Sequence, residues 1–360
     1  MTAQPDLLYT DTEDHLRSAV RSLLADRTDT RGLLARIETG DPYDPALWTS
    51  LATDIGAAGL LVPEKLGGQG ATHREAAVVL EELGRAAAPA PYLTSSVIAT
   101  ETLLGLADRS DAVTALLGDL AAGRTVAVLA LPLATAPGAS LPEGGATAVA
   151  DAAIADVLLV PGSDGLRVVQ REDARVEPLT SFDLTRPLAS VTVEGTPGVR
   201  LADAETSRTA VRRGLLAGAG LLASEQLGLA EWCLEETIRY TRERHQFNRP
   251  VGSFQALKHR LAQLWLEVAH ARAAARNAAD ALATESAEVP LAVSVAQAYC
   301  SRVAVHAAEE CIQMHAGIGM TWEHPAHLRL KRAKADEIAL GTPGRHKELL
   351  ADLVSLPAPR

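Results

Sequence analysis

Two short segments in the second half of the chain combine residue types that suit an anionic ligand. The first, Arg242-Glu-Arg-His-Gln-Phe-Asn, carries Arg244 and Gln246, and the second, Gln313-Met-His-Ala-Gly-Ile-Gly, carries Gln313 and Gly317. Guanidinium groups bind phosphate through paired hydrogen bonds, amides donate further bonds, and glycine lets a backbone approach a ligand closely. Both segments are therefore candidates for a binding site.

Each candidate also has an ordinary structural interpretation. Arg244 lies in a run of charged residues and would pass for a solvated helix end. The aromatic residues Phe247 and Phe254 could simply pack against a turn, and Gly317 could cap a helix C-terminus. The residue types alone leave both interpretations open.

Two histidines, His315 and His324, could suggest a metal site. A zinc site takes at least three protein ligands, and their spacing in the sequence is usually short. No third ligand lies at a fitting spacing from this pair, so the sequence predicts no metal.

The elements that position these residues are predicted to be mainly α-helical, with a small β domain in the middle of the chain. Apolar residues recur at three- and four-residue spacing over about Asp11–Ala107, with Thr10 or Asp11 as the expected N-cap. Short β-prone runs separated by Pro, Gly and Asp occupy about Thr125–Glu194, and a long helix is expected over Phe254–Leu282. The predicted units are a helical domain at residues 1–122, a β domain at 123–205 and a helical bundle at 206–360.

The composition limits the class of partner and the location. A formal net charge of −11 and the lack of basic runs make nucleic acid and anionic membranes unsuitable partners. The 3 cysteines are read as small buried hydrophobes, without a disulfide framework. The first residues have no apolar signal region and no later run is suited to span a bilayer, so a cytoplasmic protein is expected.

The motifs resemble those of the flavin-dependent acyl-CoA dehydrogenase family. In that family a basic pair, Gln-Phe, a Pro-x-Gly turn and Phe-Gln at a helix start follow one another, as they do here over residues 240–262. The run Gln313-Met-His-Ala-Gly-Ile-Gly is similar to the family's Gln-x-x-Gly-Gly-x-Gly stretch, and residues 59–70 with 80–85 resemble its N-terminal helical domain. The implied fold is an N-terminal helical domain, a middle β domain and a C-terminal four-helix bundle.

The resemblance implies FAD as cofactor, an acyl-CoA or other acyl thioester as substrate, and α,β-desaturation as the reaction. Carried over by position, Arg244 would pair with the pyrophosphate, Gln246 would hydrogen-bond to it, and Phe247 would pack near the adenosine. Gln313 and Gly317 would line the same moiety. In the family a neighbouring subunit makes these contacts, so a homo- or hetero-oligomer is implied.

The sequence departs from the family where the catalytic base should stand. Removal of the proton next to the thioester needs a carboxylate. The usual Glu precedes a Gly-Thr near the C-terminal end, where this chain has Leu340, and the alternative position is Gly218. Glu225 and Glu337 lie nearby in sequence, but we expect them to be surface or interface charges, and no catalytic residue is assigned to this chain.

The flavin-ring loops of the family are also missing from the middle domain. The stretch Pro132-Leu-Ala-Thr-Ala-Pro-Gly-Ala-Ser is a short, uncharged substitute for the loop, and no Trp lies between Trp48 and Trp232. This pattern resembles the smaller, base-lacking subunit of actinobacterial heteromeric acyl-CoA dehydrogenases. Two alternatives stay open: a homomeric enzyme with an unrecognised base, and a flavin-free scaffold or thioester-binding protein.

Overall fold

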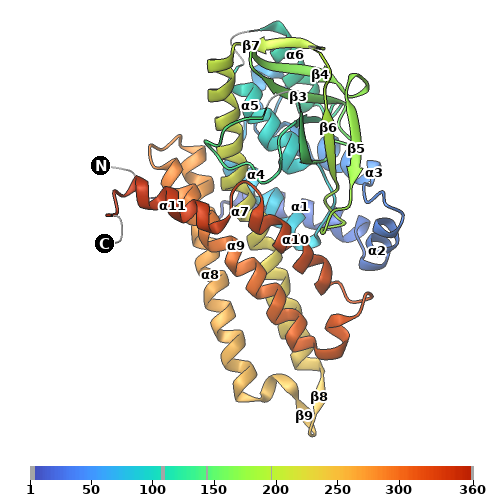
Figure 1. Ribbon diagram of the computed structural model, residues 1–360. Coiled ribbons are helices and arrows are strands. Elements are labelled where there is room, and N and C mark those ends of the chain that lie inside the picture. The colour runs from blue at the N-terminus through green and yellow to red at the C-terminus, as the bar shows by residue number, and fades with distance from the viewer. Residues whose placement is uncertain (1–4, 107–109, 143–144, 196, 358–360) are drawn as a thin grey trace.

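The computed structural model of the chain, described here for residues 5–106, 110–142, 145–195 and 197–357, is helix-rich with a small β region (Figure 1). Among the described residues, no helix is both long and apolar enough to cross a membrane. The predicted end of the first helical unit at Ala107 and the first four residues of the chain lie outside the described residues. The predicted fold class is confirmed.

Two helices of the N-terminal region, α1 and α4, begin at capping motifs that can be read directly in the sequence. α1 begins at Asp11 because the Thr10 side chain accepts from the Glu13 backbone and Glu13 in turn accepts from the Thr10 N–H, which is a capping box. α4 has the same arrangement, with Thr72 as its N-cap. The helices of this region are α1 (Asp11–Arg27), α2 (Thr30–Glu38), α3 (Pro45–Thr49), α4 (His73–Ala86), a π-helical segment (Tyr92–Ala99), α5 (Thr100–Leu104) and α6 (Asp111–Ala121).

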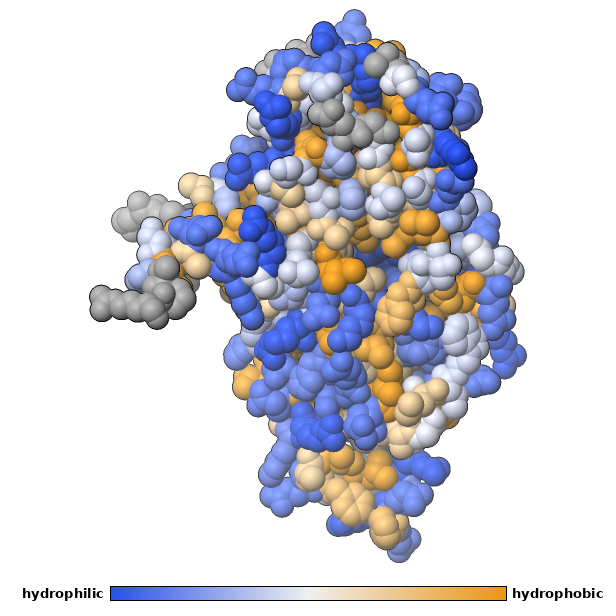
Figure 2. Space-filling model, viewed as in Figure 1, coloured by the Kyte–Doolittle hydropathy of each residue, from blue (hydrophilic) through white to orange (hydrophobic). Residues whose placement is uncertain are grey.

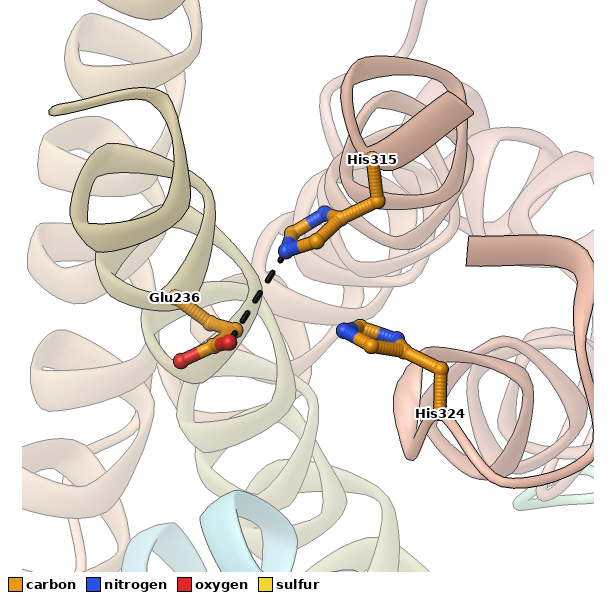
Figure 3. A group of neighbouring side chains, drawn as sticks. All are labelled: Glu236, His315 and His324. Carbon is orange, nitrogen blue, oxygen red and sulfur yellow. Dashed lines mark ion pairs between the residues drawn. The ribbon is translucent and has the colours of Figure 1, made fainter. Parts of the chain in front are cut away.

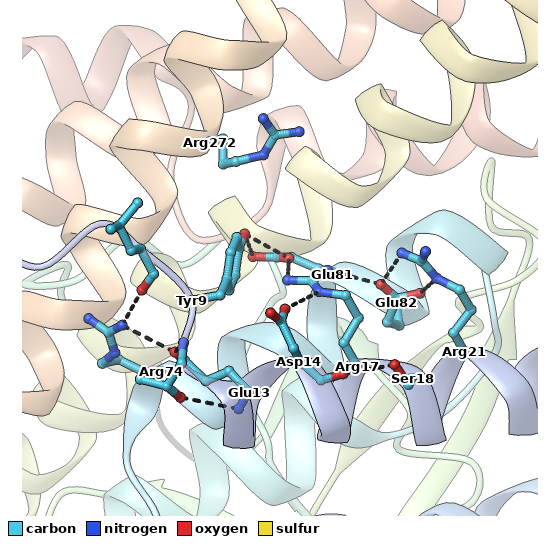
Figure 4. Close-up of polar contacts among 12 residues, drawn as sticks. Tyr9, Glu13, Asp14, Arg17, Ser18, Arg21, Arg74, Glu81, Glu82 and Arg272 are labelled. Carbon is cyan, nitrogen blue, oxygen red and sulfur yellow. Dashed lines mark hydrogen bonds and ion pairs between the residues drawn. The ribbon is translucent and has the colours of Figure 1, made fainter.

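Buried ion pairs connect α1 with α4 (Figure 4). Arg17 on α1 lies 2.6 Å from a carboxylate oxygen of Glu81 and 3.0 Å from one of Glu82, and both acids are buried. Tyr9 donates to Glu81 as well, at 2.9 Å. Burial and the neighbouring acid Glu231 raise the pKa of Glu81 to about 7 against the opposing effect of Arg17. These acids are structural, since their oxygens are already engaged.

The β region consists of two small sheets. One has the order β1-β3-β4-β7, in which only the β1–β3 pair is parallel, and the other has the antiparallel order β2-β6-β5. Their apolar faces share a core of valines, alanines and leucines. The strands are β1 (Ala127–Leu129), β2 (Gly145–Ala150), β3 (Val157–Gly162), β4 (Gly165–Gln170), β5 (Arg175–Leu179), β6 (Leu188–Thr192) and β7 (Val199–Ala202).

One long helix, α7 (Ala204–Glu243), joins the upper and lower parts of the molecule in Figure 1. Its 40 residues span about 60 Å at the rise of an α-helix. α7 packs against α4 in one region and against α8 and α9 in another, so the N-terminal helices and the bundle share one large core. The remaining helices are α8 (Gln255–Ala283), α9 (Val289–His315), α10 (Ala326–Ile338) and α11 (Pro343–Leu353).

The crossing of α4 and α7 depends on two glycines. A Cβ on Gly228 would lie 1.9 Å from the carbonyl oxygen of Glu81, and one on Gly84 would lie 2.1 Å from that of Glu225. Neither position has room for a side chain, because the obstructing atoms are backbone. The two helices therefore approach more closely than any other residue would allow at either position.

Candidate functional site

Four of the five predicted ligand-binding residues line one open groove at the lower end of the helical bundle. Arg244 and Gln246 follow the end of α7, and Gln313 and Gly317 lie where α9 ends. The groove has a volume of about 760 Å³. A Cβ on Gly317 would meet nothing within 4 Å, so this backbone is open to a ligand. The fold thus brings together two motifs that are about seventy residues apart.

Arg244 is free to bind an anion. Its neighbour Glu243 pairs with Arg239 at 2.6 Å instead, and in the part of the chain that the structure describes no ion pair engages Arg244. The Arg244 backbone ends α7 by donating to the Tyr240 carbonyl at 2.8 Å and accepting from Val251 at 2.8 Å. Arg244 is thus an exposed helix end, as the ordinary alternative expected, and it is at the same time one of the residues that line the groove.

The fifth residue, Phe247, lies outside the groove at the tip of a hairpin. The hairpin pairs β8 (His245–Gln246) with β9 (Arg249–Pro250), and Phe247 and Asn248 form its turn with φ values of 53° and 57°. Such a turn normally uses Asn-Gly, and a bulky residue at positive φ is strained. Phe247 is nevertheless 87% exposed, and Figure 2 shows apolar side chains gathered at this lower end of the molecule.

The two positions at which the family places its base meet in space and are both apolar. A Cβ on Gly218 would lie 2.5 Å from Cγ1 of Ile98 and 3.3 Å from Cδ1 of Leu340. Leu340 is 1% exposed, and its backbone N–H donates to the Leu133 carbonyl at 2.7 Å. Neither residue can accept a proton, and among the described residues none of those that line the adjoining cavity carries a carboxylate.

The cavity beside these positions is small. It has a volume of about 20 Å³, and its lining from the π-helical segment, β1, β2, α7 and the loop after β1 is apolar except for Thr94. Such a volume is about that of one water molecule, whereas pockets for organic ligands have about 300–1,000 Å³. Pro132 and Leu133, from the short, uncharged stretch after β1, are among the residues that line this cavity, which is too small for a flavin ring.

The prediction that Glu225 is a surface or interface charge is wrong. Glu225 is 1% exposed and accepts hydrogen bonds from Arg186 at 2.6 and 2.8 Å and from Arg332 at 2.6 Å. These arginines outweigh burial and hold its pKa below the usual range. Both oxygens are engaged, so Glu225 is a structural ion and is unsuited to be a base.

The same buried network includes Asp336 and Asp183. Arg186 lies 2.5 Å from Asp336, and Arg332 pairs with Asp183 and donates to Thr185. Burial and the neighbouring Glu225 raise the pKa of Asp336 to about 8. The network joins the β region to α7 and α10. Glu337, the other candidate, is half-buried and lies 3.8 Å from Lys334.

The fold also supplies what the spacing of the two histidines lacked. Glu236 on α7 has a carboxylate oxygen within 4.8 Å of a ring nitrogen of both His315 and His324. The sequence argument against a metal considered only ligands at a short sequence spacing, whereas the fold brings Glu236 to the two histidines from a distant part of the chain. Glu236 could not have been singled out from the sequence, because it lies 79 residues before His315 in an ordinary helix.

Comparison with known proteins identifies the family. The model of the acyl-CoA dehydrogenase N-terminal domain matches residues 10–110, and the model of the C-terminal domain matches residues 208–354. Acyl-CoA dehydrogenase IpdE2 of Mycolicibacterium smegmatis is 36% identical over 329 residues, which cover 91% of this chain and 94% of that protein. The chain belongs to the acyl-CoA dehydrogenase family. Enzymes of this family are FAD-dependent oxidoreductases in general.

Solved structures of the family include complexes of two different chains. A chain of the ChsE4-ChsE5 complex from Mycobacterium tuberculosis has a TM-score of 0.85 and 26% identity, covering 98% of this chain and all of that one. A chain of the Tcur3481-Tcur3483 steroid acyl-CoA dehydrogenase has a TM-score of 0.83 and 26% identity, with 96% and 98% covered. This chain is thus similar over its whole length to members of two-component assemblies.

Proposed function

We propose that this chain is a subunit of a heteromeric, FAD-dependent acyl-CoA dehydrogenase and that it completes the cofactor site of a homologous partner. The observation that carries the proposal is the contrast between two regions. The groove at the end of the bundle has a volume of about 760 Å³ and is lined by Arg244, which has no ion-pair partner among the described residues, while the cavity beside Gly218 and Leu340 has a volume of only about 20 Å³ and a mainly apolar lining. The partner would provide the base, and this chain would provide binding groups.

The groove residues fit the pyrophosphate side of a flavin dinucleotide. Arg244 would bind the phosphates, Gln246 and Gln313 would donate hydrogen bonds, and Gly317 would let the backbone approach. Bound FAD supplies the acceptor for the hydride that leaves the acyl thioester. The ring of Phe247 packs edge-on against Phe254, with centroids 6.1 Å apart, but the side chain is still 87% exposed, which supports a contact with another molecule.

Flavin absorbance tests the proposal. We expect the purified chain alone to be colourless, and co-expression with a family member that carries the Glu before Gly-Thr to give a yellow complex that an acyl-CoA substrate bleaches. A single chain that is stoichiometrically yellow and oxidises acyl-CoA would instead establish the homomeric alternative. A complex without flavin, or no complex at all, would favour the scaffold alternative.

Replacing Arg244 by Ala is expected to weaken FAD binding by the complex. A hydrogen-bonded contact to a charged group contributes about 1.5–3 kcal/mol, which corresponds to about a 10- to 150-fold rise in the Kd for FAD. Fluorescence titration of the flavin-depleted complex measures this change. Arg242→Ala is the matched control, because Arg242 is exposed on α7 but does not line the groove. Equal FAD affinity in wild type and Arg244→Ala would reject the role of Arg244.

A further inference from the structure

Three polar side chains from separate segments converge between α7, the end of α9 and the loop before α10. Figure 3 shows Glu236, His315 and His324 pointing toward one another. Each offers one ligand atom, and the three atoms lie within 4.8 Å of one another. His315 Nε2 and a Glu236 carboxylate oxygen are 3.8 Å apart. This separation is too long for a hydrogen bond.

His315 is held so that one ring nitrogen remains available. Its Nδ1 lies 2.6 Å from the Cys311 carbonyl, so Nδ1 carries the proton and donates it. The Tyr240 ring stacks on the imidazole with centroids 4.3 Å apart, which fixes the plane of the ring. The Nε2 atom is buried and has no hydrogen-bond partner among the described residues. Buried polar atoms are rarely left unpaired in folded proteins.

We propose that Glu236, His315 and His324 form a binding site for a zinc ion. Two imidazoles and one carboxylate are a common zinc ligand set, and three protein ligands leave one position for water. The hydrogen bond from Nδ1 of His315 to a backbone carbonyl is the outer contact that orients metal-binding histidines. Because His315 also lines the groove, the ion would tie the groove wall at the end of α9 to α7.

The ligands need a small adjustment to reach zinc geometry. Bonds of about 2.1 Å in a tetrahedral site put ligand atoms about 3.4 Å apart. The present separations of 3.8 to 4.8 Å therefore have to shorten by roughly 1 Å. Glu236 and His324 are only half-buried, so their side chains have room to rotate, whereas His315 is fixed.

Two cations oppose metal binding. Arg239 contacts both oxygens of Glu236 at 2.5 and 2.8 Å, so a metal ion would have to displace this two-point ion pair, whose arginine side chain is 55% exposed. Arg329 is buried on α10, and after burial and His315 the charges of Arg239 and Arg329 contribute to the lowered pKa of His324. These charges reduce the affinity without occupying the Nε2 atom of His315.

Protons compete with the metal at His315. Interactions with Cys311 and Glu236 outweigh burial and raise the pKa of His315 to about 9, whereas burial and His315 itself lower that of His324 to about 4. The charged or titratable groups that face His315 are Cys311 on α9, Glu236, Arg239 and Tyr240 on α7, His324 in the loop and Arg329 on α10.

Equilibrium dialysis of the isolated full chain against Zn²⁺, with metal analysis, tests the site without flavin or a partner. We expect one ion per chain, and at least about a 10-fold loss of affinity in His324→Ala and in Glu236→Gln. His306→Ala is the matched control, because His306 pairs with Glu267 at 2.8 Å elsewhere on the bundle and its loss should change nothing. Co²⁺ absorbance reports the coordination of the bound ion.

Three results would overturn the site: no stoichiometric zinc, unchanged affinity in both His324→Ala and Glu236→Gln, or loss of binding in His306→Ala. None of these results bears on the flavin role of Arg244.

Discussion

Arg332→Ala is expected to lower the free energy of unfolding by about 3–5 kcal/mol, because it removes one partner of a buried charge network. Arg332 is 2% exposed and neutralises Asp183 and Glu225, which are also buried. Without the guanidinium, Glu225 retains only Arg186, and Asp183 loses its one ion pair among the described residues. The remaining carboxylates would have to be protonated or solvated inside the protein, and either process costs free energy.

Urea denaturation followed by circular dichroism measures this loss. Arg124→Ala is the control, since Arg124 forms an ion pair with Asp119 in which both side chains are largely exposed. Such a pair contributes about 0–1 kcal/mol. If Arg332→Ala proves as mild as Arg124→Ala, the network does not carry the stability assigned to it.

Gly228→Ala should destabilise the protein by about 2 kcal/mol, although alanine is the better helix former. Overpacking a core lowers the free energy of unfolding by up to about 3 kcal/mol, and replacing a helical glycine by alanine raises it by about 1 kcal/mol. The cost is at the upper end because the new Cβ would meet the Glu81 carbonyl oxygen at 1.9 Å, and backbone cannot rotate away. α4 and α7 would have to separate.

Thermal unfolding of Gly228→Ala and Gly317→Ala makes a matched comparison. The Gly317 backbone has an ordinary φ and open space around it, so a methyl group there should leave the melting temperature unchanged. In the heteromeric complex the same Gly317→Ala substitution is expected to weaken FAD binding. Equal melting temperatures for both variants would mean that the α4–α7 crossing tolerates separation.

The long helices were predictable because their signals are local. The helix expected over Phe254–Leu282 is α8, Gln255–Ala283, and the predicted Thr10 cap is present. The β-prone runs predicted at residues 125–131, 157–160, 166–169 and 190–193 correspond to β1, β3, β4 and β6, whereas β2, β5 and β7 were not anticipated. β2 is built of Gly, Ala, Thr and Val, and β5 contains Pro178, which a sheet accepts only at its edge. Their pairing with β6 and β4 comes from tertiary contacts.

The error on Glu225 has a similar cause. A carboxylate in a long helix is usually solvated, and its two arginine partners lie 39 and 107 residues away in the sequence. Only the packing of the β region and α10 on α7 creates the buried environment. For the same reason, the proximity of Glu236 to the two histidines of the proposed zinc site could not be predicted from the sequence.

The motif residues alone determined the family, the α-rich fold and the absence of a base at Gly218 and Leu340, because residue identity and local spacing carry that information. Tertiary structure decided that these two positions meet beside one small, mainly apolar cavity, and that Arg244 and Gln313 share a large groove. Such facts depend on which distant segments pack together. Packing is a property of the whole chain, since each apolar face is buried only by elements far away in the sequence.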